Sequence, residues 1–361
     1  MERRNLLQGV AAVAFAQGAS AIRAALIIEP AGDHLSYYYR TGLCAGVGEF
    51  AVADETGQTF ATARKTLGER AIRTYQDPVR MMTEFRPQLV VVSMEPQRMP
   101  AAIEVALTHG AHVVAEKPAC TRLDQFEKLA NVAGANKRQL MLAMATRLHP
   151  AMIRARELIQ AGWIGRGYGV DLLWIADQTR LKNPAYHRTW KASRTRGGGG
   201  KLIFHGIHYL DAIRYLTCDS ISQVCGFCRN VGGQPIEVED AAVVSMLFTS
   251  GMVGTLNTGY YLDRGYAHLV ALWGAEGWLR FQPWETEVLT WHSTAESAPR
   301  GVQRITGTQP VAAYDLMLQA AVDFAGGRRE PFMTTEESLA ALRTVFAAYR
   351  AAETGRAQRV G

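Results

Sequence analysis

The segment Ala111-His-Val-Val-Ala-Glu116-Lys117-Pro118 determines the fold prediction. Its apolar residues, which include two β-branched valines, are typical of a short strand buried in a parallel sheet, and Pro118 ends that strand. Glu116 and Lys117 therefore lie at the carboxyl end of a strand, where open α/β sheets bind their ligands. A lysine at such a position either forms an ordinary salt bridge or acts on a substrate hydroxyl group.

The chain on both sides of this segment alternates between apolar strands and helices of about ten residues. Further strands are predicted at 24–28, 49–54, 72–75, 88–93 and 139–143. This alternation predicts an α/β fold in which residues 22–145 form a Rossmann-type, doubly wound parallel sheet. From Gly167 onward several strands follow one another without helices, so residues 146–361 are predicted to form an α+β domain with an open, mostly antiparallel sheet.

The first predicted strand leads into the turn Glu29-Pro-Ala-Gly32-Asp-His34, and the second strand ends at Asp54. Such spacing, about twenty residues, matches a nucleotide-binding βαβ unit whose carboxylate binds the adenosine ribose, and this carboxylate favours NAD over NADP. However, Glu29, Ala31 and His34 stand where a G-x-G-x-x-G loop has glycines. Either Glu29 points away from the pyrophosphate, or other loops hold the cofactor, or dinucleotide binding has been lost.

A second informative segment begins with the glycines at 197–200 and continues into a predicted helix that carries His208 and Asp211 within one turn. A histidine with an ordinary pKa of about 6.5 can take or give a proton at physiological pH, and alcohol oxidation requires such a transfer. The alternative is that His208 is a structural helix residue and that the glycines form a flexible loop.

Together the two segments resemble the Gfo/Idh/MocA oxidoreductases, named for glucose-fructose oxidoreductase and inositol dehydrogenase. Glu116-Lys117-Pro118 is similar to the E-K-P motif of this family, and residues 206–211 are similar to its G-x-H-x-x-D helix. The resemblance covers the chain from about Ala24 to Val360. It implies a Rossmann domain that binds NAD or NADP, followed by a domain whose open sheet shapes a sugar or polyol site and mediates homo-oligomers, either dimers or tetramers.

The resemblance also implies roles for individual residues. Lys117 and His208 would be catalytic, one polarising the substrate hydroxyl group and the other accepting its proton as hydride leaves for the nicotinamide. Trp190 is added as a substrate contact because aromatic side chains commonly line ligand sites. The residues assigned to the cofactor, preferably NAD, are Gly32, His34, Asp54, Ser93, Pro96, Glu116 and Lys117, and those assigned to the substrate are Lys117, Trp190, His205 and His208.

Two departures from the family pattern concern the site. The family often has an aspartate four residues before the histidine, whereas this chain has Phe204, followed by His205. A phenyl ring neither holds a hydroxyl group nor tunes a neighbouring imidazole by charge. Met99 stands where a histidine is common in the family. These changes leave the particular reaction open.

The composition argues against several other classes of protein. With 361 residues, of which 48% are hydrophobic and 20% charged, the chain is long enough for two globular domains. The 39 basic and 33 acidic side chains are interspersed, so the net charge of +6 forms no basic patch for nucleic acid. No apolar run reaches the ~20 residues of a membrane span. Cys225 and Cys228 lie on one predicted strand and point to opposite faces, so no metal site is expected.

The N-terminal residues 1–21 have a pattern of their own. Arg3-Arg4, the apolar stretch Leu6–Ala16 and the small residues Ala19-Ser20-Ala21 resemble a twin-arginine export signal. This resemblance predicts a periplasmic protein. The alternative is a solvent-facing first helix of a cytoplasmic enzyme.

Three functions are consistent with these features. The first is an NAD(P)-dependent oxidoreductase that oxidises a hydroxyl group of a sugar, polyol or glycoside. The second is a redox-neutral hydrolase, eliminase or epimerase, in which transient oxidation acidifies a neighbouring C–H bond. The third is a non-enzymatic nucleotide-sensing regulator, motivated by Glu29, Ala31 and Phe204. The presence of both Lys117 and His208 favours an enzyme.

Overall fold

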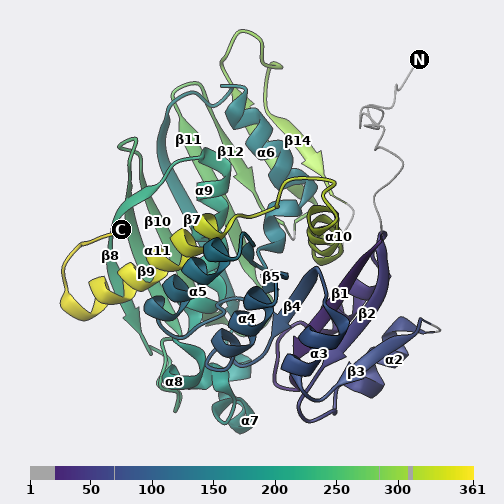
Figure 1. Ribbon diagram of the computed structural model, residues 1–361. Helices are drawn as coiled ribbons and strands as arrows, with labels where there is room; N and C mark the ends of the chain where they lie inside the picture. The colour runs from purple at the N-terminus through teal and green to yellow at the C-terminus, as the bar shows by residue number, and fades with distance from the viewer. Residues whose placement is uncertain (1–20, 69, 284, 308–311) are drawn as a thin grey trace.

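Two β-sheets form the framework of the protein in the computed structural model, which describes residues 21–68, 70–283, 285–307 and 312–361. Figure 1 shows the first sheet at the lower right and the second sheet, with helices in front of it, on the left. Residues 1–20, and with them nearly all of the predicted export signal, lie outside the described residues.

The first sheet is parallel throughout and has the order β3-β2-β1-β4-β5-β6. The order reverses between β1 and β4, which creates a crevice at the carboxyl ends of these two strands. Nearly all residues of β1 and β4 are apolar and buried. The predicted Rossmann-type sheet is therefore confirmed, with strands β1 (Ile22–Ile28), β2 (Val47–Ala53), β3 (Ile72–Tyr75), β4 (Leu89–Ser93), β5 (His112–Ala115) and β6 (Leu140–Leu142).

The helix after β1 is unusually short, because α1 has only four residues before the chain tightens into the 3-10 helix η1. In contrast, α3 was not among the predicted helices. Its start is nevertheless marked in the sequence, since Asp77 accepts a hydrogen bond from the Val79 N–H (2.8 Å) and Pro78 opens the first turn. The elements are α1 (Leu35–Tyr38), η1 (Tyr39–Leu43), α2 (Phe60–Leu67), α3 (Pro78–Phe85), α4 (Met99–Thr108) and α5 (Leu123–Ala135).

The second sheet has the order β14-β13-β12-β11-β7-β10-β9-β8-β15, and β7–β10 is its one parallel pair among the described strands. The predicted open, mostly antiparallel sheet is confirmed. The strands β12, β13 and β14 were not predicted individually. The strands are β7 (Gly167–Asp177), β8 (Ile221–Arg229), β9 (Ala241–Phe248), β10 (Val253–Leu262), β11 (Ala267–Gly274), β12 (Gly277–Phe281), β13 (Glu287–Ser293), β14 (Gln303–Thr306) and β15 (Gln358–Arg359).

Helices cover one face of the second sheet, where Figure 1 shows α6, α9 and α11. The short elements after β7 lead instead toward the first domain. None of the helices in the described part of the chain has the length and apolarity needed to cross a membrane. The elements are η2 (Ala145–Leu148), α6 (Pro150–Gln160), η3 (Thr179–Lys182), α7 (Pro184–His187), η4 (Trp190–Ala192), α8 (Arg194–Gly197), the π-helix η5 (Leu202–Gly206), α9 (Ile207–Thr217), α10 (Ala313–Ala325) and α11 (Thr335–Thr354).

The last two helices also complete the first domain. Helix α10 packs against β1, β4 and η1. On α11, the hydroxyl oxygens of Thr335 and Ser338 accept hydrogen bonds from the N–H groups of Leu140 (2.9 Å) and Leu142 (3.1 Å). These two donors belong to β6, the edge strand of the first sheet, so α11 satisfies N–H groups that an open edge would leave unpaired.

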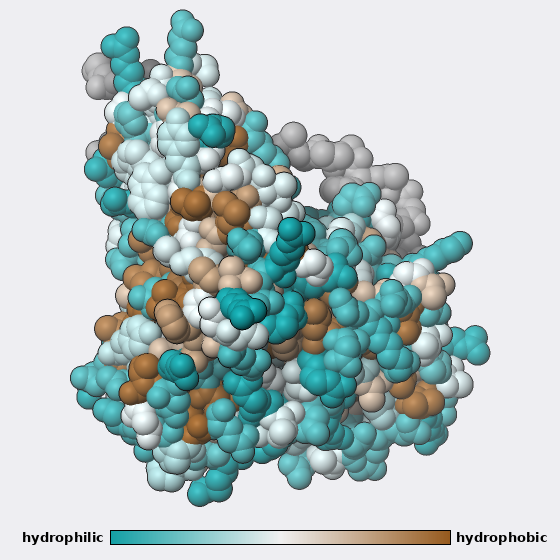
Figure 2. Space-filling view, turned by 90° about the vertical axis from the view of Figure 1, so that its left-hand side faces the viewer, coloured by the Kyte–Doolittle hydropathy of each residue, from teal (hydrophilic) through white to brown (hydrophobic). Residues whose placement is uncertain are grey.

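The other face of the second sheet carries an apolar patch, formed by Phe227 (70% exposed), Val243 (43%), Leu247 (40%) and Val253 (57%). Phe227 lies opposite Val243, and Leu247 lies opposite Val253, so the four side chains extend across β8, β9 and β10. Figure 2, which views the molecule from the side of β8, shows hydrophobic residues gathered among hydrophilic ones. Exposed apolar clusters of this kind commonly mark interaction surfaces.

Candidate active site

A cavity of about 1280 Å³ lies between the two sheets. Ligand sites in proteins commonly measure roughly 300–1,000 Å³, so this cavity can enclose a sugar with room to spare. It brings together the predicted catalytic residues Lys117, from the end of β5, and His208, from α9. Of the other predicted site residues, His34, Trp190 and His205 line it as well.

Lys117 connects the first sheet to the helix that carries His208. Its ammonium group donates a hydrogen bond to the backbone oxygen of Phe204 (2.8 Å) and lies 3.7 Å from Glu116 Oε1. The acceptor belongs to η5, a π-helical turn, and such turns are frequent at functional sites. An ammonium group has three N–H donors, so this arrangement leaves Lys117 able to bind a substrate oxygen. The salt-bridge alternative is only part of its environment.

Glu116 is buried behind Lys117 and holds several groups in place. It accepts a hydrogen bond from the Tyr38 hydroxyl group and lies 3.1 Å from His34 Nδ1. Burial alone would raise the pKa of Glu116, but His34 and then Lys117 hold that pKa below its ordinary value. Glu116 is therefore an anion that fixes His34 at the cavity wall and attracts Lys117.

His208 is neutral in this environment. Its side chain is 9% exposed, and its Nδ1 atom has no hydrogen-bond partner among the described residues. Burial, followed by the positive charges of Lys117, His34 and Lys201, holds the pKa of His208 well below its ordinary value of 6.5. A neutral imidazole can accept a proton from a substrate hydroxyl group, which is the role that a general base requires.

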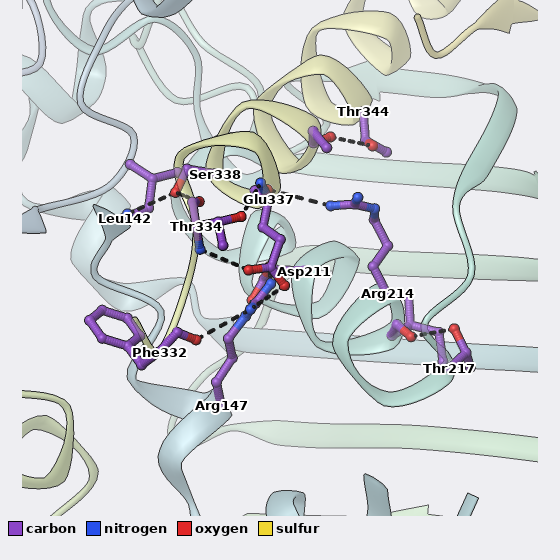
Figure 3. A network of polar contacts seen from close by, with 12 residues as sticks. Leu142, Arg147, Asp211, Arg214, Thr217, Phe332, Thr334, Glu337, Ser338 and Thr344 are labelled. Carbon is purple, nitrogen blue, oxygen red and sulfur yellow. Dashed lines mark hydrogen bonds and ion pairs between the residues drawn. The ribbon is translucent and has the colours of Figure 1, made fainter. Parts of the chain in front are cut away.

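The helix that presents His208 is anchored by a buried ion-pair network, drawn in Figure 3. Both oxygens of Asp211 accept hydrogen bonds from the guanidinium of Arg147, at 2.8 and 2.7 Å, and Arg147 also contacts Glu337 of α11 at 2.8 Å. Burial alone would lower the pKa of Arg147, but Asp211 and Glu337 hold that pKa above its ordinary value. The aspartate of the G-x-H-x-x-D helix thus positions α9 and is not exposed to the cavity.

We predict that Asp211→Asn lowers the free energy of unfolding by about 3–5 kcal/mol, because it leaves a buried guanidinium charge incompletely paired. Urea denaturation measures the effect. Asp124→Asn is the matched control, since Asp124 forms an exposed ion pair with Arg122 and its loss should cost below about 1 kcal/mol. Equal losses for the two variants would contradict the anchoring role of Asp211.

Phe204 and Trp190 pack on each other at the position where the family pattern has an aspartate. Their rings meet edge to face with centroids 5.3 Å apart, and each residue is only 4% exposed. The Trp190 indole N–H donates to the backbone oxygen of Ala31 (2.8 Å). Trp190 therefore joins the second domain to the turn after β1, with only a narrow part of its ring at the cavity. His205 lies deeper in the wall, between the rings of Trp174 and Tyr260.

The outer half of the crevice, where the turn after β1 would face a pyrophosphate, contains ion pairs. Glu29 accepts a hydrogen bond from the Glu95 N–H (2.6 Å) and pairs with Arg98, which also contacts Glu55 at 2.6 Å. The segment that follows β7 lies over the same turn, and its Lys191 pairs with Asp33 at 2.6 Å. Glu29 thus points into the crevice with a cation of its own.

The remaining residues assigned to the cofactor are occupied by contacts within the protein. Asp54 is 1% exposed, and its oxygens accept four hydrogen bonds from Thr56 and Thr59, so the ribose assignment of Asp54 is wrong for this structure. Ser93 donates to the backbone oxygen of Asp33 (2.7 Å). A Cβ atom at Gly32 would lie 2.3 Å from the Ser93 backbone oxygen, so Gly32 permits a close approach of the chain to itself.

Pro96 is buried, and neither Pro96, Ser93, Gly32 nor Asp54 lines the cavity. As these residues stand, the outer half of the crevice does not fit the adenosine diphosphate part of a dinucleotide. The inner half, with His34 and Lys117 at the cavity and Glu116 behind them, remains open.

Two family models identify the class of protein. Residues 43–144 match the model described as "Oxidoreductase family, NAD-binding Rossmann fold", and residues 152–280 match the "GFO/IDH/MocA C-terminal domain". Together these matches cover more than half of the chain, and the chain belongs to the Gfo/Idh/MocA oxidoreductase family. The first match begins only after β1, its turn and α1, which is the region where the glycine loop is altered.

Individual relatives are distant. The chain is 24% identical over 262 residues to 1,5-anhydro-D-fructose reductase from Ensifer adhaerens, an alignment that covers 71% of this chain and 74% of the relative. A crystal structure of an oxidoreductase domain protein from Kribbella flavida superposes with a TM-score of 0.81 at 20% identity and covers 95% of this chain and 100% of its own. A levoglucosan dehydrogenase in complex with NADH and levoglucosan gives 0.80 at 17% identity, with 94% and 99% covered.

Several cavity residues were missed by the sequence analysis because they lie on strands of the second sheet. Trp174, on β7, lies opposite His268 of β11 and Thr258 of β10. The two-residue alternation of each strand separates its faces, but it does not show which face meets the cavity. The missed residues that line it are Trp174, Arg180, Tyr260, Tyr266, His268 and Tyr314.

Proposed function

We propose that the protein oxidises a hydroxyl group of a sugar, polyol or glycoside by hydride transfer to a nicotinamide dinucleotide. The observation that carries this proposal is the meeting of Lys117 and neutral His208 in one enclosed cavity. Membership of the oxidoreductase family supports hydride transfer as the reaction type.

The two residues divide the work at the substrate oxygen. Lys117 donates a hydrogen bond to that oxygen and stabilises the negative charge that develops on it. His208 accepts the hydroxyl proton, because a neutral imidazole has a free lone pair. The hydrogen bond from Lys117 to Phe204, four residues before His208, keeps the two groups on adjacent walls. The position left empty by the missing aspartate is filled by Phe204 and excludes water from this part of the cavity.

We predict that Lys117→Ala and His208→Ala each lower kcat/KM by about 10²–10⁴-fold on any sugar that the wild-type protein oxidises, because each removes a group that acts on the transferred proton or its oxygen. Product formation across a panel of sugars and polyols measures the effect. His109→Ala is the matched control, since His109 lies outside the cavity at the end of α4. Unchanged activity of both variants would show that the chemistry lies elsewhere.

NAD is the proposed hydride acceptor on the strength of the family alone, since the outer half of the crevice does not accommodate its adenosine part. The same closed crevice favours a second candidate function. If the acceptor is not exchanged between turnovers, the protein catalyses a redox-neutral cleavage, elimination or epimerisation. Twin-arginine export remains a prediction, and it would also require that the acceptor is retained.

We predict that protein purified from the periplasm and then denatured releases NAD in an amount close to one per chain. Chromatography of the released nucleotide gives its identity, and NADP would correct the choice of cofactor. Net formation of NADH from added sugar supports the dehydrogenase, whereas a cleaved or inverted sugar without NADH supports the redox-neutral reaction. Protein that is cytoplasmic and free of nucleotide would contradict both export and retention.

We also propose that the apolar patch on β8, β9 and β10 binds a second copy of this chain. Four apolar side chains in register on an uncovered sheet face can pair with the same surface of another subunit, as an isologous interface requires.

We predict that Phe227→Asp combined with Val253→Asp shifts the protein toward monomers, because two charges would be buried in the interface. Size-exclusion chromatography with light scattering measures the mass. Leu43→Asp is the control, because Leu43 is 52% exposed but belongs to the first domain. A wild-type protein that is already monomeric at micromolar concentration would overturn this proposal.

A further inference from the structure

The charged residues that line the cavity do not balance. Three acids line it, and each pairs with a base that also lines it: Asp33 with Lys191 (2.6 Å), Asp315 with Arg40 (2.7 Å) and Glu95 with Arg196. Lys117 has Glu116 nearby at 3.7 Å. Arg180 and Arg188 have no ion-pair partner among the residues that the structure describes. The cavity therefore carries an excess of positive charge.

Arg180 is the more telling of the two, because it is held in place by aromatic residues. Its Nη2 atom donates to the Tyr266 hydroxyl oxygen (2.9 Å), and its guanidinium lies 5.6 Å from the centre of the Tyr260 ring. A guanidinium that is positioned by a ring and a hydroxyl group, with no carboxylate partner, is preorganised to bind an anion. Arg188, in contrast, is exposed at the rim.

Lys201 provides an independent sign of the same imbalance. Its side chain is completely buried, and its ammonium nitrogen has no hydrogen-bond partner among the described residues. It lies 4.5 Å from the centre of the Tyr260 ring, on which Arg180 also packs. Burial, then Arg180 and Lys117, lowers the pKa of Lys201 to about 6. A second cation is thus disfavoured where no anion is present to balance it.

The position of Arg180 relates it to the substrate. Tyr260 contacts the His205 ring at a centroid distance of 5.8 Å, His205 contacts Trp174 at 5.1 Å, and Trp174 contacts His208 at 5.3 Å. Arg180 therefore lies on the same wall as His208 but a few ring widths away. This separation suits a substrate that has its reacting hydroxyl at one end and a charged group at the other.

We propose that the substrate is an acidic carbohydrate, whose carboxylate binds the guanidinium of Arg180 while a hydroxyl group lies between Lys117 and His208. This inference rests on the proposed function for the second contact only. A carboxylate suits the site because it is planar and singly charged and can accept two parallel hydrogen bonds from one guanidinium.

Binding of acids and of their neutral counterparts tests this proposal without requiring turnover. Isothermal titration calorimetry with D-glucuronate, D-galacturonate and D-gluconate is compared with the parent hexoses and with D-glucuronamide, which keeps the shape but lacks the charge. We expect at least one acid to bind roughly tenfold to a hundredfold more tightly than its neutral counterpart, and added salt to reduce the difference. The ring acids and the open-chain gluconate distinguish the two sources of the carboxylate. Equal affinity for all acids and their neutral counterparts would overturn the proposal.

Variants locate the effect. Arg180→Gln should reduce the preference for the acid by about tenfold or more, and Arg180→Lys should reduce it less, because lysine keeps the charge but loses the paired donors. Arg350→Gln removes the same charge from the exposed part of α11 and should leave the preference intact. If Arg180→Gln fails to fold, the wild-type comparison of glucuronate with glucuronamide decides alone.

Two further outcomes separate this inference from the proposed function. Tight binding of an acid with no oxidation of it would support the anionic ligand and contradict the oxidoreductase activity. If Arg180→Gln weakens the binding of added NAD but leaves the preference for acids unchanged, Arg180 serves the nucleotide and the proposal falls.

Discussion

The hydrogen bond from Lys117 to the backbone oxygen of Phe204 is the contact on which the site depends. It joins the carboxyl end of a central parallel strand to the helical segment that carries His208, so two chemically active groups from different domains share one wall. The ion pairs behind it, between Asp211 and Arg147 and between Glu116 and His34, hold the two partners of that contact. Because these carboxylates are buried and already paired, they position the site without competing for the substrate.

The electrostatic character of the cavity follows from the same arrangement. Carboxylates that could balance its cations either pair with other bases or lie behind the wall, and the histidines inside it are neutral because burial disfavours their charged form. The turn after β1 adds a second asymmetry. A glutamate, an arginine and another glutamate occupy the space that glycines leave open for a pyrophosphate in related folds, so the chain departs from its family at the cofactor rather than at Lys117 and His208.

Much of the architecture could be predicted from local patterns. Apolar runs separated by helices gave the parallel sheet, and the spacing of E-K-P and G-x-H-x-x-D placed Lys117 and His208 in one site. Asp54 was misassigned because its spacing from the first turn matched a ribose-binding acid, whereas Thr56 and Thr59, two and five residues later, use all of its hydrogen-bonding capacity. Arg180 and Tyr260 could not be found, since their meeting depends on the register of distant strands. The partner of Trp190, a backbone oxygen in the first domain, was equally invisible to a pattern of residue types.

The cover that α10 and α11 give to the first sheet has a consequence for how the protein is made. The Rossmann-type sheet is encoded in the first part of the chain, yet the N–H groups of its edge strand β6 find their partners on α11, close to the C-terminus. During synthesis that edge and the face under α10 must wait for almost the entire chain, and contacts so distant in sequence form slowly. The N-terminal half is therefore not a module that could be cut out or transplanted, and its nascent form presents an aggregation-prone edge until the last helix arrives.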